Sequence, residues 1–219
     1  MTILITNPNY DTTTSYTFIY ARELIEFAKN NSINFTSFSK PKLTKDNITK
    51  FIKKMNPELC IFNGHGDDLT IYGDKINDVE EPLIELGING DLLSNKMTYA
   101  RTCSAASSLG KECIKNGGCF IGYSIPFQFA IDRKWSANPS KDKIARIFLE
   151  PSNLLAIALL NGNTAKDAVE KSNKESKQNI IRLLHKKDEL GSLLYIKLLW
   201  SNMLGLEILG DEDMRYSAN

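Results

Sequence analysis

Short apolar runs alternate along this chain with longer segments whose apolar residues recur at helical spacing, and this alternation limits the fold more than any other feature. The runs are rich in β-branched and aromatic residues, so each predicts a strand; they cover residues 2–6, 33–38, 59–62, 97–102 and 119–123. The segments between them predict helices at 15–29, 44–55 and 104–116. Strands and helices that alternate in this way form a mostly parallel sheet with helices on both faces.

The rest of the chain predicts two long loops and a helical end. Residues 67–94 are rich in Gly, Asp and Asn and predict an excursion that holds a hairpin or a helical turn. Residues 124–140 are too long for a simple connector, and we interpret them as a wall of a substrate site. Helices are predicted at 153–160, 164–186 and 193–203, and a last strand at 206–209. A chain of 219 residues with 42% apolar residues can bury a sizeable core, which predicts one α/β domain over residues 1–219.

Charge and cysteine content narrow the function classes. The 27 Lys and Arg residues nearly balance the 26 Asp and Glu residues, so no overall field favours nucleic acid or an acidic membrane as a partner. The first residues show no signal peptide, and no stretch approaches the ~20 apolar residues that span a bilayer. The four cysteines are not needed as disulfides in a chain with a core of this size. We therefore expect a soluble cytoplasmic protein that binds neither nucleic acid nor membrane.

His65 is the first candidate for chemistry. It follows the buried strand at 59–62 and lies between two glycines, whereas His185 belongs to a lysine-rich helical stretch. Ligands of open α/β sheets bind beyond the carboxyl ends of the strands, which is where His65 is expected. The alternative is a glycine-rich turn that happens to contain a histidine.

Cys103 is the second candidate, because it ends the strand at 97–102 and precedes the small residues 104–108. A helix that begins there would lower the pKa of the thiol, and its backbone amides could stabilise an oxyanion. The alternative is a small buried apolar residue, which is our interpretation of Cys60, Cys113 and Cys119. The cysteines lack the CxxC spacing of zinc and thiol redox sites. A cysteine phosphatase needs Arg six residues after the nucleophile, and that position is Leu109. Glycine-rich nucleotide-binding motifs are absent as well. We expect neither a metal nor a cofactor.

Together these motifs resemble those of the caspase-like cysteine peptidases, in which a His-Gly ends one strand and a Cys ends the next. Here His65-Gly66 is followed by Ala-Arg-Thr-Cys-Ser at residues 100–104. The gingipain-type and CHAT-type branches are closer still. Residues 206–211 resemble the LLGDP ending of gingipain-like domains, with Glu212 in place of proline, and residues 159–168 are similar to their L-x-x-G-x-T-x-x-x-A pattern.

The resemblance implies a caspase-like α/β/α sandwich and a cysteine endopeptidase that acts on a protein or peptide, with a regulatory protein partner as a further expectation. Cys103 would be the nucleophile that forms a thioester, and His65 would give a proton to the leaving amine. The amides of Gly66 and Cys103 would bind the oxyanion. Two alternatives remain open: a catalytically silent caspase-like module for protein interaction, and hydrolysis of a small amide metabolite.

Specificity is expected to depend on residues near the two motifs. Arg101 lies two residues before Cys103 and is predicted to point the same way, where it would pair with an acidic substrate side chain. Asp67 or Asp68 could instead neutralise Arg101, which leaves a pocket for small or uncharged side chains, or could themselves select a basic residue. Tyr123 and Ser124, at the end of the last strand before the long loop, complete the predicted substrate-binding set.

Overall fold

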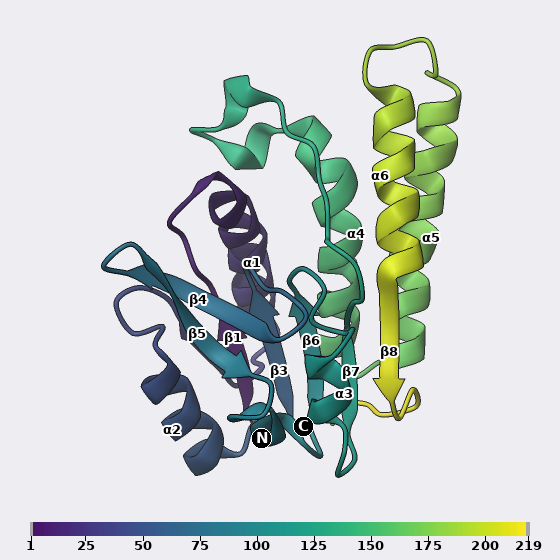
Figure 1. Cartoon of the computed structure of the whole chain (residues 1–219). Helices are drawn as coiled ribbons and strands as arrows, with labels where there is room; N and C mark the ends of the chain where they lie inside the picture. The colour runs from purple at the N-terminus through teal and green to yellow at the C-terminus, as the bar shows by residue number, and fades with distance from the viewer. Residues whose placement is uncertain (1, 218–219) are drawn as a thin grey trace.

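A six-stranded sheet forms the centre of the protein (Figure 1). The computed structural model describes residues 2–217. The strand order is β2-β1-β3-β6-β7-β8, and all neighbouring pairs are parallel except β7 and β8. The strands are β1 (Ile3–Thr6), β2 (Phe35–Phe38), β3 (Leu59–Asn63), β6 (Met97–Arg101), β7 (Cys119–Tyr123) and β8 (Leu206–Gly210). The predicted mostly parallel α/β sheet is confirmed.

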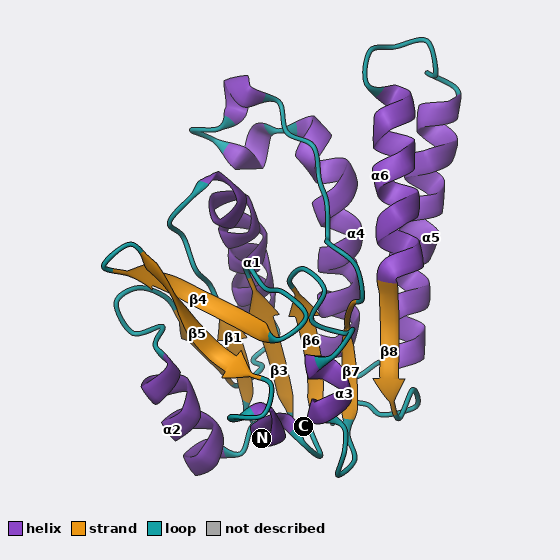
Figure 2. Cartoon of the chain, in the orientation of Figure 1, coloured by secondary structure: helices purple, strands orange, loops and turns teal. Residues whose placement is uncertain are grey.

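Helices cover both faces of the sheet (Figure 2). On one face, α1 (Thr12–Asn30), α4 (Lys143–Leu160) and α5 (Ala165–Leu184) share a core with Ile3, Ile5 and their counterparts on the other strands. On the opposite face, α2 (Lys45–Met55) and α3 (Leu109–Cys113) share a second core with Leu4 and its counterparts. Successive strand residues thus point to opposite cores, which is why the inner strands are mostly apolar.

The long excursion after β3 contains both of the elements that the sequence allowed. It forms the antiparallel hairpin β4 (Thr70–Ile76) and β5 (Val79–Glu85), followed by a single 3-10 turn at Gly90–Leu93. The hairpin lies over the face of the sheet that α2 covers (Figure 1).

The prediction of a helix at residues 104–116 is wrong for residues 104–108. Residues 104–108 form turns, and α3 begins only at Leu109. The backbone amide of Ala106 donates to the carbonyl of Tyr123 at 3.0 Å, and that of Ser104 donates to the carbonyl of Ile125 at 3.3 Å. Ser104 also has a φ of 54°. Contacts with the end of β7 therefore override the helical preference of these small residues.

Among the C-terminal helices, α4 differs most from its prediction, and the difference is in where it begins. α4 begins ten residues before the predicted start, because Asp142 accepts hydrogen bonds from the amides of Ile144 and Ala145 and so caps it. α5 and α6 (Ser192–Gly205) form a helical hairpin beside the sheet edge, and α6 leads directly into β8 (Figure 1). In the part of the chain that the structure describes, we find no helix with the length and apolar content needed to cross a bilayer.

Candidate active site

The two candidate residues follow neighbouring parallel strands in the same register. Asn63 at the end of β3 pairs with Arg101 at the end of β6, so His65 and Cys103 each lie two residues beyond that pair. The loops that carry them are in close contact, since a Cβ atom placed on Gly66 would lie 2.9 Å from the Cβ of Thr102. Gly64 has a φ of +122°, and a Cβ there would lie 2.6 Å from the Cγ of Pro8, so the turn before His65 requires glycine.

His65 and Cys103 line one open cleft of about 420 Å³. Its other lining residues come from three elements that are distant in the sequence: Thr12 and Thr13 of α1, Phe127, Gln128, Phe129 and Ile131 of the loop after β7, and Leu198 of α6. The loop at residues 124–140 therefore supplies one wall of this cleft.

The sequence did not single out Asp11, which joins the site through His65. Its Oδ2 lies 2.7 Å from His65 Nε2. A carboxylate can only accept here, so Nε2 carries the proton and Nδ1 is left for proton transfer. Asp11 follows β1, the strand next to β3, and also caps α1 by accepting the amide of Thr14 at 2.7 Å. A carboxylate just past a neighbouring strand was the signal that could have identified it.

The surroundings of Asp11 keep it ionised. Burial by itself would raise its pKa, but hydrogen bonds from the amide of Thr14 and from His65 outweigh burial and hold the pKa below its ordinary value. The preceding residue, Tyr10, donates its hydroxyl to Glu80 of the hairpin at 2.5 Å, and its ring centroid lies 5.9 Å from that of His65. The hairpin thus fixes the loop that carries the carboxylate.

Cys103 is half-buried, and its environment differs from the predicted one. Burial raises the pKa of its thiol above the ordinary value. The expected helix N-terminus is absent because α3 begins six residues later, at Leu109. The Sγ atom contacts the carbonyl oxygen of Phe127 at 3.7 Å. The predicted lowering of the pKa is therefore wrong, and the thiol is protonated at neutral pH until a base accepts its proton.

The remaining cysteines are buried, and all four are free of disulfides. Burial raises the pKa of Cys60, Cys113 and Cys119 to about 12. Their position among apolar side chains fits the interpretation of small core residues.

Two backbone amides near the cleft carry no hydrogen bond to the protein within residues 2–217. Gly66 and Ile71 face each other in an isolated antiparallel β-bridge. The hydrogen bonds on either side of it run from the amide of Asp67 to the carbonyl of Thr70 and from the amide of Tyr72 to the carbonyl of His65. The amide of Gly66 is therefore not used in this bridge. The amide of Cys103 likewise donates to no acceptor in this part of the chain. These are the two amides that the resemblance assigns to oxyanion binding.

Arg101 does not line the cleft, and the prediction that it reads the substrate is wrong. It is 1% exposed, and its guanidinium donates to Asn63 Oδ1 at 2.6 Å and to Asn153 Oδ1 at 2.7 Å. The physical reason is that Arg101 is still part of the central strand β6, so its side chain enters the layer between the sheet and helices α1 and α4. Only beyond the strand does the chain turn to present Cys103.

The two acids that were expected to act with Arg101 do not contact it. Asp67 Oδ1 accepts the amides of Leu69 and Thr70, and its Oδ2 accepts the hydroxyl of Tyr72, so it holds its own loop. Asp68 is exposed, and the hydrogen bonds of Arg101 run to neutral groups. The predicted neutralisation of Arg101 by either acid is therefore wrong.

Tyr123 and Ser124 support the cleft wall and do not line it. Tyr123 is buried, with its ring centroid 4.7 Å from that of Phe127. Ser124 donates its amide to the carbonyl of Gly205 at 2.8 Å. Among the described residues, then, the predicted substrate-binding set lies behind or beside the cleft that holds His65 and Cys103.

The α/β/α sandwich, with a cysteine and a histidine just past adjacent parallel strands, is the architecture of the caspase-like class. The crystal structure of the Arg-specific cysteine proteinase gingipain R is similar to this chain, with a TM-score of 0.62 and 10% sequence identity. The match covers 99% of this chain but only 48% of the gingipain R chain. No protein-family model and no curated protein matches the sequence. The caspase-like fold is confirmed, and membership of the gingipain-type or CHAT-type branch stays a prediction.

Proposed function

We propose that this chain is a cysteine peptidase that cleaves protein or peptide substrates. The observation that carries the proposal is the convergence of Cys103, His65 and Asp11 at the ends of three adjacent parallel strands. A nucleophile, a base and a group that orients the base are the parts that nucleophilic catalysis requires.

The proposed reaction begins when Cys103 Sγ attacks the scissile carbonyl carbon while its proton passes to His65 Nδ1. The oxyanion accepts hydrogen bonds from the amides of Gly66 and Cys103. The imidazolium, stabilised by ionised Asp11, then gives its proton to the leaving nitrogen as the C–N bond breaks and the thioester forms. A water molecule that loses its proton to His65 attacks the thioester, which releases the acid and regenerates the thiol.

The alternative is a catalytically silent module that binds other proteins through the same fold. One observation favours it: burial raises the pKa of Cys103, which disfavours the reactive thiolate. An acyl-transfer enzyme for a small amide is less well supported, because the cleft is open and bordered by a long loop that suits an extended chain.

Active-site labelling and mutagenesis separate these functions. We expect an electrophilic thiol probe to label the folded protein at Cys103, and Cys103→Ala or His65→Ala to abolish peptide hydrolysis with an unchanged circular dichroism spectrum. Cys60→Ala is the matched control: it should retain activity and lose on the order of 1 kcal/mol of stability. Unlabelled Cys103 in a folded protein that cleaves no peptide would support the binding module.

A further inference from the structure

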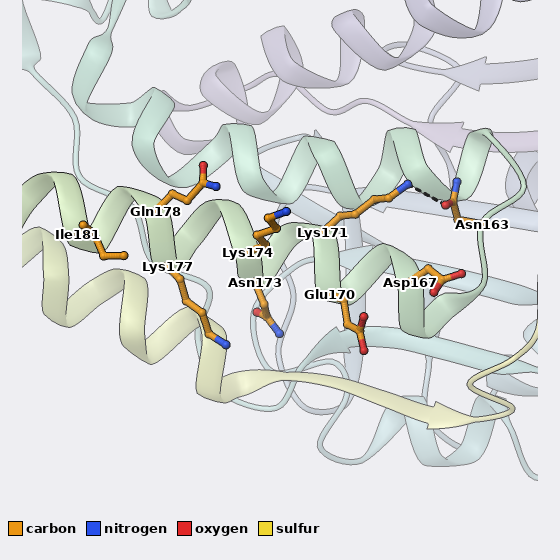
Figure 3. Close-up of a pocket in the computed structure, with 9 residues that line it drawn as sticks. All are labelled: Asn163, Asp167, Glu170, Lys171, Asn173, Lys174, Lys177, Gln178 and Ile181. Atoms are coloured by element: carbon orange, nitrogen blue, oxygen red, sulfur yellow. Dashed lines mark hydrogen bonds between the residues drawn. The ribbon is translucent and has the colours of Figure 1, made fainter.

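The cleft at Cys103 differs in chemistry from the larger groove along α5. A groove of about 770 Å³ along α5 is lined by both acids and lysines, among them Asp167, Glu170 and Lys171 (Figure 3). The cleft at Cys103, in contrast, has four apolar lining side chains: Phe127, Phe129, Ile131 and Leu198. Its remaining lining residues, apart from His65 and Cys103, are two threonines and a glutamine, which carry no charge.

The apolar wall is held in place before any substrate arrives. The backbone amide of Gln128 donates to Asn202 Oδ1 at 2.9 Å, and Asn202 Nδ2 donates to the carbonyl of Gln128 at 2.7 Å. The rings of Phe127 and Phe129 lie 6.1 Å apart, and Phe129 packs against Tyr16 with a centroid distance of 5.9 Å. A wall fixed in this way discriminates between side chains because it does not rearrange to admit a poor fit.

Two charged residues near the cleft, Arg101 and Asp11, already have partners within the protein. Arg101 is buried behind the sheet end, and Asp11 uses Oδ1 for Thr14 and Oδ2 for His65. A basic substrate side chain that approached Asp11 would compete with His65 and Thr14 for a carboxylate that both already contact. The wall formed by Phe127, Phe129, Ile131 and Leu198 offers a charged side chain no partner, whereas a large apolar side chain would cover apolar surface there.

We infer that the cleft accepts a large uncharged apolar side chain, such as Leu, Met or Phe, from the residue that precedes the cut. The inference rests on the proposed peptidase function. The preceding residue is the relevant one because its carbonyl carbon becomes bonded to Cys103 Sγ, which lies 3.7 Å from the carbonyl oxygen of Phe127 on the apolar wall.

The test is a library of fluorogenic peptide amides that vary only in the residue before the cleaved amide. Cleavage after Leu, Met or Phe should exceed cleavage after Asp, Glu, Lys or Arg by about tenfold or more. Leu198→Asp should reverse part of this preference towards Lys and Arg, and Leu198→Asn should not. Leu193→Asp, at an exposed position on a different face of the same helix, is the matched control and should leave the preference unchanged.

The possible results distinguish the inference from the proposed function. Dominant cleavage after basic or acidic residues, with Cys103 labelled, overturns the apolar preference and leaves the peptidase function intact. An unaltered preference in Leu198→Asp would also overturn it. Absence of cleavage with every peptide, together with unlabelled Cys103, overturns the proposed function and the inference with it.

Discussion

Replacing Asp11 with asparagine isolates the catalytic contribution of the carboxylate from its structural one. Asp11 has two roles, since Oδ1 caps α1 through Thr14 and Oδ2 accepts the proton-bearing nitrogen of His65. Asparagine is as good a helix cap as aspartate, so Asp11→Asn should keep the helix start intact. It removes the negative charge that stabilises the imidazolium. Because Oδ1 stays on the Thr14 amide, it also turns the Nδ2 donor towards His65, which favours the tautomer with its proton on Nδ1.

The expected magnitude follows from the contact at 2.7 Å and from the exposure of its partners. A hydrogen bond to a charged group contributes about 1.5–3 kcal/mol. The side chains of His65 and Asp11 are 29% and 37% exposed, so solvent screening favours the lower end, about 1.5 kcal/mol. Since about 1.4 kcal/mol corresponds to a factor of ten in rate, loss of the charge alone lowers kcat/KM roughly tenfold. The unfavourable His65 tautomer adds to this, so we expect a fall of at least about tenfold.

The assay is steady-state hydrolysis of the best library peptide, together with urea unfolding from pH 2 to 7. Because the folded-state pKa of Asp11 is lowered, its charge stabilises the fold above the ordinary value of 3.8 and this stabilisation disappears as the pH falls through the lower folded value. The difference in unfolding free energy between the unmodified protein and Asp11→Asn should therefore become smaller as the pH falls. An Asp11→Asn variant with unchanged kcat/KM would refute the assigned role.

Three further predictions follow from the packing around the site. Arg101→Ala should lower the free energy of unfolding by about 3–5 kcal/mol in urea titrations, because it leaves a cavity and unpaired Oδ1 atoms on Asn63 and Asn153. The residue preference of any folded enzyme should stay the same. Alkylation of Cys103 by iodoacetamide without substrate should keep accelerating above pH 9, since burial raises its pKa; mass spectrometry showing a plateau below about pH 8 would contradict this. Asn202→Ala removes both hydrogen bonds to the Gln128 backbone and should raise KM more than it lowers kcat; an unchanged KM in the peptide assay would show that this clamp does not position the wall.

The sheet was predictable because its inner strands are buried on both faces and therefore mostly apolar. Burial of β3, β6 and β7 between two helical layers produces continuous apolar runs that no surface element would carry. The turns at residues 104–108 were not predictable in the same way. Their conformation depends on hydrogen bonds to residues of β7 and the loop beyond it, and local propensity contains no information about those partners.

The errors at the site have a related origin. Strand alternation correctly places Arg101 and Cys103 on the same side of an extended chain, but the strand ends at Arg101, and the chain turns before Cys103. Sequence periodicity extends a strand as far as the pattern allows, whereas the structure ends it where pairing ends. The two residues therefore occupy different surroundings, one in the interior and one at the cleft.

The strand order explains why Asp11 belongs to the site although it lies 54 residues before His65. In the order β2-β1-β3-β6, the strands β1, β3 and β6 are adjacent, and their carboxyl ends deliver Asp11, His65 and Cys103 to one edge of the sheet. Sequential strands in βαβ folds are usually neighbours, but the chain here passes from β1 to the outer strand β2 and back across β1 to β3. The first strand thus lies directly beside β3, the strand that precedes His65. The loop after the first strand is therefore the place to seek the group that orients the histidine. That assignment requires the sheet order as well as the positions of the strands.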